Sequence, residues 1–176
     1  MRVVCQEESR LGLHVPSPRR LTGYGVKPVQ VVEPLSESYW LSAAVEPTTG
    51  DACWWEWPPL EAECFPLFRG QLGRRDADRL NLILLDQAPA HVAPRVQWPD
   101  NVVLVWSPAY SPAWPPVARL WEDLKGRIDV GDTRVRSSLT ALQQHVAEIV
   151  QRYTTETIAS LTGYAYLVEA ARALSF

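Results

Sequence analysis

The 176-residue sequence predicts an α/β domain in which a mixed β-sheet is flanked by helices. Short runs rich in β-branched and aromatic residues come first, and proline or glycine bounds each of them. Two continuous apolar runs follow at 80–86 and 101–107, and such runs are typical of buried central strands. Apolar residues at helical spacing lie before, between and after these runs, which is the order expected of helices that cover a sheet.

The first third of the chain is expected to form strands. Residues 2–8 are a β-branched run that ends in acids, whereas 9–27 are rich in proline, glycine and arginine and are predicted to be a loop or hairpin. The sequence "PTTGD" at 47–51 has the composition of a tight turn. Three further strands are predicted, and together with this turn they indicate an antiparallel meander: 26–33, 37–47 and 51–59.

Helices are predicted from the 3.6-residue spacing of apolar side chains. Residues 60–75 show this spacing, and Pro66 inside them predicts a kink or a late helix start. The stretch 117–128 is amphipathic, and from Ser137 to the end the pattern is helical, with Gly163 as a break. Four side chains of 117–128 are expected in the core: Val117, Leu120, Trp121 and Leu124.

Composition bounds the classes of protein that the chain can belong to. It is 47% hydrophobic and 21% charged, which favours a packed core over global disorder. A net charge of −3 does not favour a stand-alone nucleic-acid binder. Three cysteines without CxxC spacing indicate a reduced, intracellular protein. The sequence has neither an 18-residue apolar run nor a signal peptide, so we expect a cytoplasmic protein that does not cross a membrane.

Acidic residues stand at the ends of the predicted strands and on one helix. Glu7 and Glu8 close the first strand, Asp86 ends the most buried one, and Glu122 and Asp123 lie on the helix 117–128. Open α/β sheets place their sites at the carboxyl ends of central strands. Converging carboxylates there would bind Mg²⁺ or Mn²⁺, which can activate a water molecule in phosphoryl transfer. A single acid at a strand end is also common as a turn former or helix cap, and the pattern alone leaves both interpretations open.

Six motifs follow one another in the order found in a known family: "CQEESRLGL", "GVKPVQ", "AVEPTTG", "LNLILLDQAPAH", "NVVLVWSPAYSP" and "RLWEDLKGRI". With them the chain resembles the catalytic domain of bacterial insertion-sequence transposases in the Tc/mariner-like DDE superfamily, the branch called six-thirty. The resemblance implies a ribonuclease-H-like domain over 1–130, followed by a helical extension over 131–176. It also implies metal-dependent DNA strand cleavage and transfer, with two Mg²⁺ or Mn²⁺ ions held by three carboxylates.

The family motifs transfer unevenly to this chain. The first family Asp, in the pattern Q-D-E-S-R, corresponds to Glu7, which keeps the carboxylate but moves it outward by one methylene. A displacement on the order of 1 Å can cost about a hundredfold in rate. The second Asp corresponds to Asp86, and His91 matches the His that commonly follows it. Gln87 stands where the family usually has Asn.

The third acid is where the chain departs most from the family. The family pattern Y-S-P-E-L-N-P-x-E-R-L-W reads Y-S-P-A-W-P-P-V-A-R-L-W here, so Ala118 occupies the position of the catalytic Glu, 32 positions after Asp86. An alanine cannot bind a metal ion. Glu122 lies four residues later, about 6 Å further along the helix axis on roughly the same face. We therefore take Glu7, Asp86 and Glu122 as the candidate catalytic and metal-binding set, while a surface role for Glu122 stays open.

The resemblance also sets expectations for partners. Family members place helix-turn-helix modules before this domain, and this sequence starts at the first catalytic strand. We expect DNA, as transposon ends and target, to be the main partner. A separately encoded helix-turn-helix protein and a second copy of the chain are further expected partners. The alternative functions are a non-catalytic DNA-binding or interaction module and a decaying fragment of a mobile element, each retaining the fold.

Overall fold

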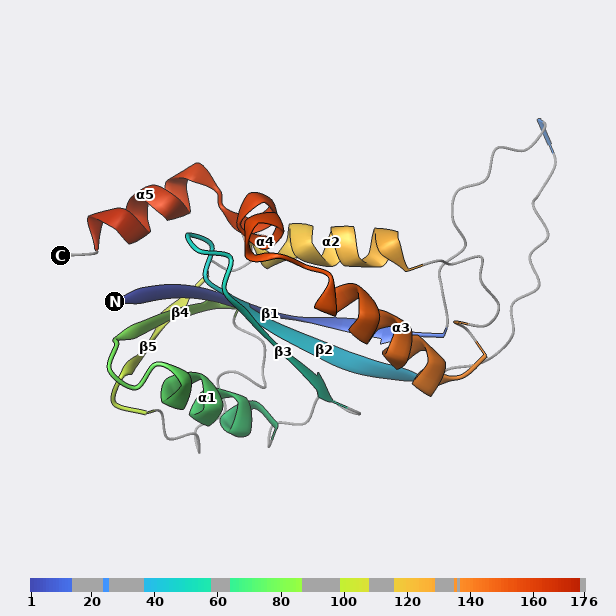
Figure 1. The fold of residues 1–176 in the computed structure, drawn as a ribbon, viewed down its shortest axis with the longest axis horizontal. Coiled ribbons are helices and arrows are strands. Elements are labelled where there is room, and N and C mark those ends of the chain that lie inside the picture. The colour runs from blue at the N-terminus through green and yellow to red at the C-terminus, as the bar shows by residue number, and fades with distance from the viewer. Residues whose placement is uncertain are drawn as a thin grey trace.

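The computed structural model describes residues 1–13, 24–25, 37–57, 64–86, 99–107, 116–128, 135 and 137–174. Within them a five-stranded sheet has the order β3-β2-β1-β4-β5, with α1 on one face and α2 to α5 on the other (Figure 1). The strands are β1 (Arg2–Gly12), β2 (Ser38–Val45), β3 (Ala52–Trp57), β4 (Asn81–Leu85) and β5 (Val102–Trp106). The helices are α1 (Cys64–Arg75), α2 (Val117–Arg127), α3 (Leu139–Gln151), α4 (Thr155–Thr162) and α5 (Ala165–Ala173).

The sheet is mixed because β1 pairs differently on its two sides. It runs antiparallel to β2 and parallel to β4, while β2 and β3 are antiparallel and β4 and β5 are parallel. This confirms the predicted mixed sheet flanked by helices. The predicted strand 26–33 lies outside the described residues.

The first strand is longer than its sequence pattern indicates. Residues 9–12 were expected to belong to a loop or hairpin, but they continue β1 and pair with β2 from Ser9 opposite Leu41 to Gly12 opposite Ser38. The expectation was wrong because the arginine and glycine content of this stretch disfavours a strand only weakly. Pairing with a complete neighbouring strand decides the outcome.

Two apolar cores lie on the two faces of the sheet. Along β1, Val4 packs in the core on the α1 side, and Cys5 and Leu11 pack in the core beneath α2. This follows from the two-residue repeat of side-chain direction along a strand. All four residues predicted for the core of α2 are buried: Val117, Leu120, Trp121 and Leu124.

The helix boundaries can be compared with those that the sequence predicts. The described part of helix α1 is Cys64–Arg75, without a break at Pro66, and residues 60–63 of the predicted helix lie outside the described residues. The break at Gly163 separates α4 from α5 as predicted. A second break, before α4, was not predicted, although the Thr154 side chain caps α4 by accepting a hydrogen bond from the Thr157 N–H. Among the described helices, none is long and apolar enough to cross a membrane.

The C-terminal helices share the core of the sheet. Val146 of α3, Ile158 of α4 and Leu167 of α5 belong to the same buried cluster as Leu120 of α2. The turn between β2 and β3 also touches α4 closely, because a Cβ placed on Gly50 would overlap the backbone carbonyl of Thr155. Residues 137–174 therefore pack as one body with the sheet.

A buried ion cluster holds the amino end of β1. Arg2 is only 5% exposed. Its Nε donates to Glu46 at 3.0 Å, one terminal nitrogen lies 2.6 Å from Asp51, and the other contacts Asp76. Arg75 of α1 also pairs with Asp51 at 2.7 Å. The cluster joins β1, the β2–β3 turn and the end of α1. It lies at the amino end of β1.

Candidate active site

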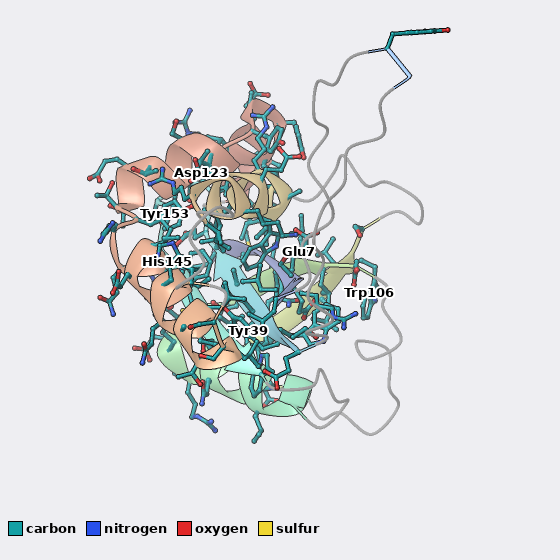
Figure 2. All side chains as sticks on the ribbon, turned by 90° about the vertical axis from the view of Figure 1, so that its right-hand side faces the viewer. Glu7, Tyr39, Trp106, Asp123, His145 and Tyr153 are labelled. Atoms are coloured by element: carbon teal, nitrogen blue, oxygen red, sulfur yellow. The ribbon has the colours of Figure 1, made fainter. Side chains whose placement is uncertain are left out.

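Glu7, in the middle of β1, and Asp86, directly after β4, lie near each other just beyond the point where the parallel pairing of these two strands ends. The parallel pairing of β1 with β4 ends with Cys5 opposite Leu84, and Glu7 and Asp86 each lie two residues beyond that pair. Within β1, Glu7 shares the side-chain direction of Cys5, which packs in the core beneath α2, whereas Asp86 follows β4 and is exposed. The Glu7 carboxyl is therefore on the face of the sheet that α2 covers (Figure 2), and the charge of Asp86 is near enough to raise its pKa.

The surroundings of Glu7 disfavour its negative charge. Burial raises the pKa of its carboxyl, the charges of Asp86 and Glu8 raise it further, and the result is about 7. Lys125 and the indole of Trp121 act in the opposite direction and lower this pKa. The site thus holds two carboxylates whose mutual repulsion is only partly offset by nearby protein groups.

Two buried polar atoms face this site without a regular hydrogen bond. Within the described part of the chain, Glu7 Oε2 and Trp121 Nε1 are both buried and lack a partner of normal geometry. The indole N–H is nonetheless near enough to lower the pKa of Glu7. A buried carboxylate oxygen with unused acceptor capacity, next to a second carboxylate, fits a hard divalent cation. Glu7 and Asp86 are thus a suitable pair of ligands.

A small hollow opens at the carboxyl edge of the sheet. Glu7, Asp86, Ser107 and Pro116 are among the residues that line it. The backbone N–H of Ser107 donates to the carbonyl of Leu85 at 2.9 Å, which holds the end of β5 beside the end of β4. Pro116 immediately precedes α2, so this helix begins at the hollow.

Among the described residues of α2, no acid acts on the pKa of Glu7. Ala118 is in the first turn of α2 and is partly buried, whereas Glu122, one turn later, is exposed. The groups on α2 that act on the pKa of Glu7 are Lys125 and Trp121. Among the residues that the structure describes, no three histidine, cysteine or acidic side chains are grouped as metal ligands. The role of Glu122 stays a prediction, and Gln87 and His91 lie outside the described residues.

Sequence reasoning placed Trp121 only in the core and gave Lys125 no role at the site. Both residues act on Glu7, because a helix that crosses a sheet presents residues three and four positions apart to the same neighbour. The three- and four-residue spacing of positions 118, 121, 122 and 125 was visible in the sequence. Which of these residues approach Glu7 could be decided only once the side of α2 that faces Glu7 was known.

Comparison with known proteins gives the chain a family. Residues 2–140 match the family described as DDE superfamily endonuclease. A protein of Sinorhizobium fredii, the uncharacterized protein y4pE/y4sA, is 31% identical over 87 residues, which is 49% of this chain and 64% of the relative.

Solved structures of Mos1 transposase share the fold. A Mos1 paired-end complex with the left transposon end is similar with a TM-score of 0.66 at 16% identity, covering 97% of this chain and 53% of that one. A pre-cleavage Mos1 transpososome has a TM-score of 0.70 at 16% identity and covers 97% and 56%. The chain thus spans about half the length of these Mos1 chains, and the likeness confirms the expected ribonuclease-H-like fold.

The family match and the fold agree with the arrangement of the site. The matched residues contain both Glu7 and Asp86, as well as the whole of α2. The resemblance inferred from the sequence motifs is confirmed at the level of family and fold, and the chain belongs to the DDE superfamily endonucleases.

Proposed function

We propose that this chain is the catalytic domain of a Tc/mariner-like transposase that cuts and joins DNA strands with the help of Mg²⁺ or Mn²⁺. The observation that carries the proposal is the proximity of Glu7 to Asp86, which line one hollow together at the start of α2. The family match supports it. So do the Mos1 structures, which include a strand transfer complex and paired-end complexes with Mn and with Mg.

The residues of the site have separate tasks in this proposal. Glu7 and Asp86 would hold a divalent cation, which supplies Lewis-acid chemistry to a phosphodiester when bound. The indole N–H of Trp121 lowers the pKa of Glu7 and so favours the charged carboxylate that a cation needs. Lys125 offsets part of the negative charge, and we propose that Glu122 reaches the site through a water molecule.

The substitution at Ala118 should leave such an enzyme weak. Loss of one of three carboxylate ligands removes both a contact to the cation and the charge that attracts it. We therefore expect slow strand nicking that is stronger with Mn²⁺, whose coordination is less demanding, than with Mg²⁺. Partners would be transposon ends and target DNA, a separately encoded helix-turn-helix protein and a second copy of the chain, in the cytoplasm.

The proposal can be tested by nicking of a supercoiled plasmid with the purified chain, comparing Mn²⁺ with EDTA. Asp86→Asn should abolish the metal-dependent nicking. The matched control is Asp78→Asn, because Asp78 is exposed after α1 and lies at the opposite end of β4 from the site. Nicking that survives Asp86→Asn would come from a contaminant or another site and would count against the proposal.

A second candidate function is a non-catalytic DNA-binding module. The alanine at 118 and the absence of a three-ligand group among the described residues favour it. It predicts DNA binding that is sensitive to salt and indifferent to Asp86→Asn, without nicking at any Mn²⁺ concentration. The two candidates are separated by running the binding and nicking assays on the same protein.

A further inference from the structure

An aromatic and cationic cluster joins the start of α5 to α2. The guanidinium carbon of Arg119 lies 4.4 Å from the centre of the Tyr164 ring. The rings of Tyr164 and Tyr166 are 5.7 Å apart and tilted by 44°. We call these three residues the Arg119–Tyr164–Tyr166 cluster. It connects a part of the chain that the sequence had assigned to a separate extension with the helix that begins at the candidate site.

The cluster borders the candidate site. Arg119 directly follows Ala118, the position of the third acid. Pro116, which lines the hollow with Glu7 and Asp86, is three residues before Arg119. The cluster is therefore attached to the first turn of the helix that begins at the hollow.

The start of α5 is anchored on the core, whereas the side chain of Tyr166 stays partly exposed. Leu167 and Ala171 are buried and fix α5 on the core. Gly163 leaves no space for a Cβ beside the carbonyl of Ala159, which fixes the corner between α4 and α5. Tyr166, between these anchors, is 42% exposed. A cation–π pair that only attached α5 to α2 would need Arg119 and Tyr164, and it would not require an exposed second ring.

An exposed tyrosine next to an arginine is suited to binding a single nucleic-acid strand. An aromatic ring offers a stacking surface to any base, and a guanidinium offers donors and charge to the phosphates on either side. Arg119 is exposed, so its outer N–H groups are open to such contacts.

We propose that the Arg119–Tyr164–Tyr166 cluster binds an unpaired nucleotide next to the candidate site. The base stacks on Tyr166, and its phosphate contacts Arg119. This inference rests on the proposed function, because it takes DNA as the substrate. It adds the surface on which a strand would be held, and it assigns part of that surface to the C-terminal helices.

The test measures binding without chemistry. The full chain is titrated into a fluorescently labelled single-stranded oligonucleotide in EDTA at low salt, and anisotropy is recorded. A second oligonucleotide of the same length carries abasic positions, which keep the phosphates and remove the bases. EDTA prevents cleavage, so failure of the catalytic proposal would appear as absent nicking in Mn²⁺ and would not affect this measurement.

Four variants separate stacking from other contributions. Tyr166→Ala should weaken binding of the normal strand by roughly five- to a hundredfold, the range covered by stacking of one base, and should leave the abasic strand unchanged. Tyr166→Phe keeps the ring and should bind like wild type. Arg119→Gln should lower the dependence of log affinity on log salt by about one phosphate contact. Tyr24→Ala is the control, because Tyr24 is a fully exposed tyrosine outside the cluster.

Three results would overturn the inference. Wild-type protein that binds the normal and abasic strands equally well would exclude stacking. Equal losses in Tyr166→Phe and Tyr166→Ala would assign the effect to the hydroxyl group. No loss in Tyr166→Ala, with circular dichroism showing a folded protein, would remove Tyr166 from any DNA-binding surface.

Discussion

The carboxyl of Glu7 should make the stability of this protein depend on pH. Its pKa rises from the ordinary 4.5 to about 7 in the folded chain, mainly through burial and then through repulsion by Asp86 and Glu8. The folded state therefore binds this proton more tightly than the unfolded state does. The free energy of unfolding falls as pH rises from about 4.5 to about 7, and stays at its lower value above that range.

The size of the effect follows from the size of the shift. A pKa shift of one unit corresponds to about 1.4 kcal/mol, so the rise of the Glu7 pKa from 4.5 to about 7 changes the free energy of unfolding by at most about 3 kcal/mol. The side chain is only partly buried and water screens its charge, so we expect about 1–2 kcal/mol. Glu7→Gln removes the titration and should raise the free energy of unfolding by that amount at pH 8, with no gain at pH 4.

Thermal or urea unfolding across pH 4–8 measures this difference directly. For a chain of this length, 1–2 kcal/mol corresponds to a shift of roughly 3–6 °C in Tm. Glu148→Gln is the matched control for the loss of a carboxylate, because Glu148 is exposed on α3 and far along the chain from the site. A Glu7→Gln variant that is no more stable than wild type at pH 8 would refute the reasoning about charge repulsion at the site.

Three other changes have definite expected outcomes. Ala118→Glu should raise Mn²⁺-dependent plasmid nicking at least tenfold, because it supplies the third carboxylate. Ala118→Gln is the control and should not raise it. Equal activity of the two variants would argue against a metal-ligand role for residue 118. Gly50→Ala should cost about 2 kcal/mol or more in urea unfolding, because Gly50 has φ +73° and its Cβ would overlap Thr155. Gly126→Ala is the control, because Gly126 lies on α2 with open space around it, and it should be neutral or stabilising by up to about 1 kcal/mol. Similar losses of unfolding free energy in Gly50→Ala and Gly126→Ala would contradict the close packing at Gly50. Arg2→Met should cost about 3–5 kcal/mol, because three carboxylates lose their buried cation, and a loss under 1 kcal/mol would show that the cluster is dispensable.

Patterns that depend on burial were readable from the sequence. The apolar run 80–86 became β4 with Asp86 directly after it, because a strand covered on both faces needs apolar residues at every position. The apolar side of α2 was assigned correctly for the same reason. The proximity of Glu7 to Asp86 was expected from the placement of both acids at strand ends, although β1 continues past Glu7 to Gly12.

Features that depend on tertiary contacts were not readable. The extension of β1 to Gly12 is decided by pairing with β2, and no local signal marks it. The approach of Lys125 and Trp121 to Glu7 depends on how α2 is rotated over the sheet. The packing of α5 beside the site depends on the corner at Gly163, of which the sequence shows only the glycine. The third ligand could not be assigned, because the motif itself changes at Ala118.

The buried Arg2 cluster bears on how such a chain can change over time. It secures β1 at the end remote from the acids, and the apolar cores hold α2 through side chains other than Ala118. A change at position 118 therefore leaves both the Arg2 cluster and the core packing of α2 in place. Under the proposed function, the residues that carry the chemistry and those that hold the fold are separate sets, so the first set can change without unfolding the protein.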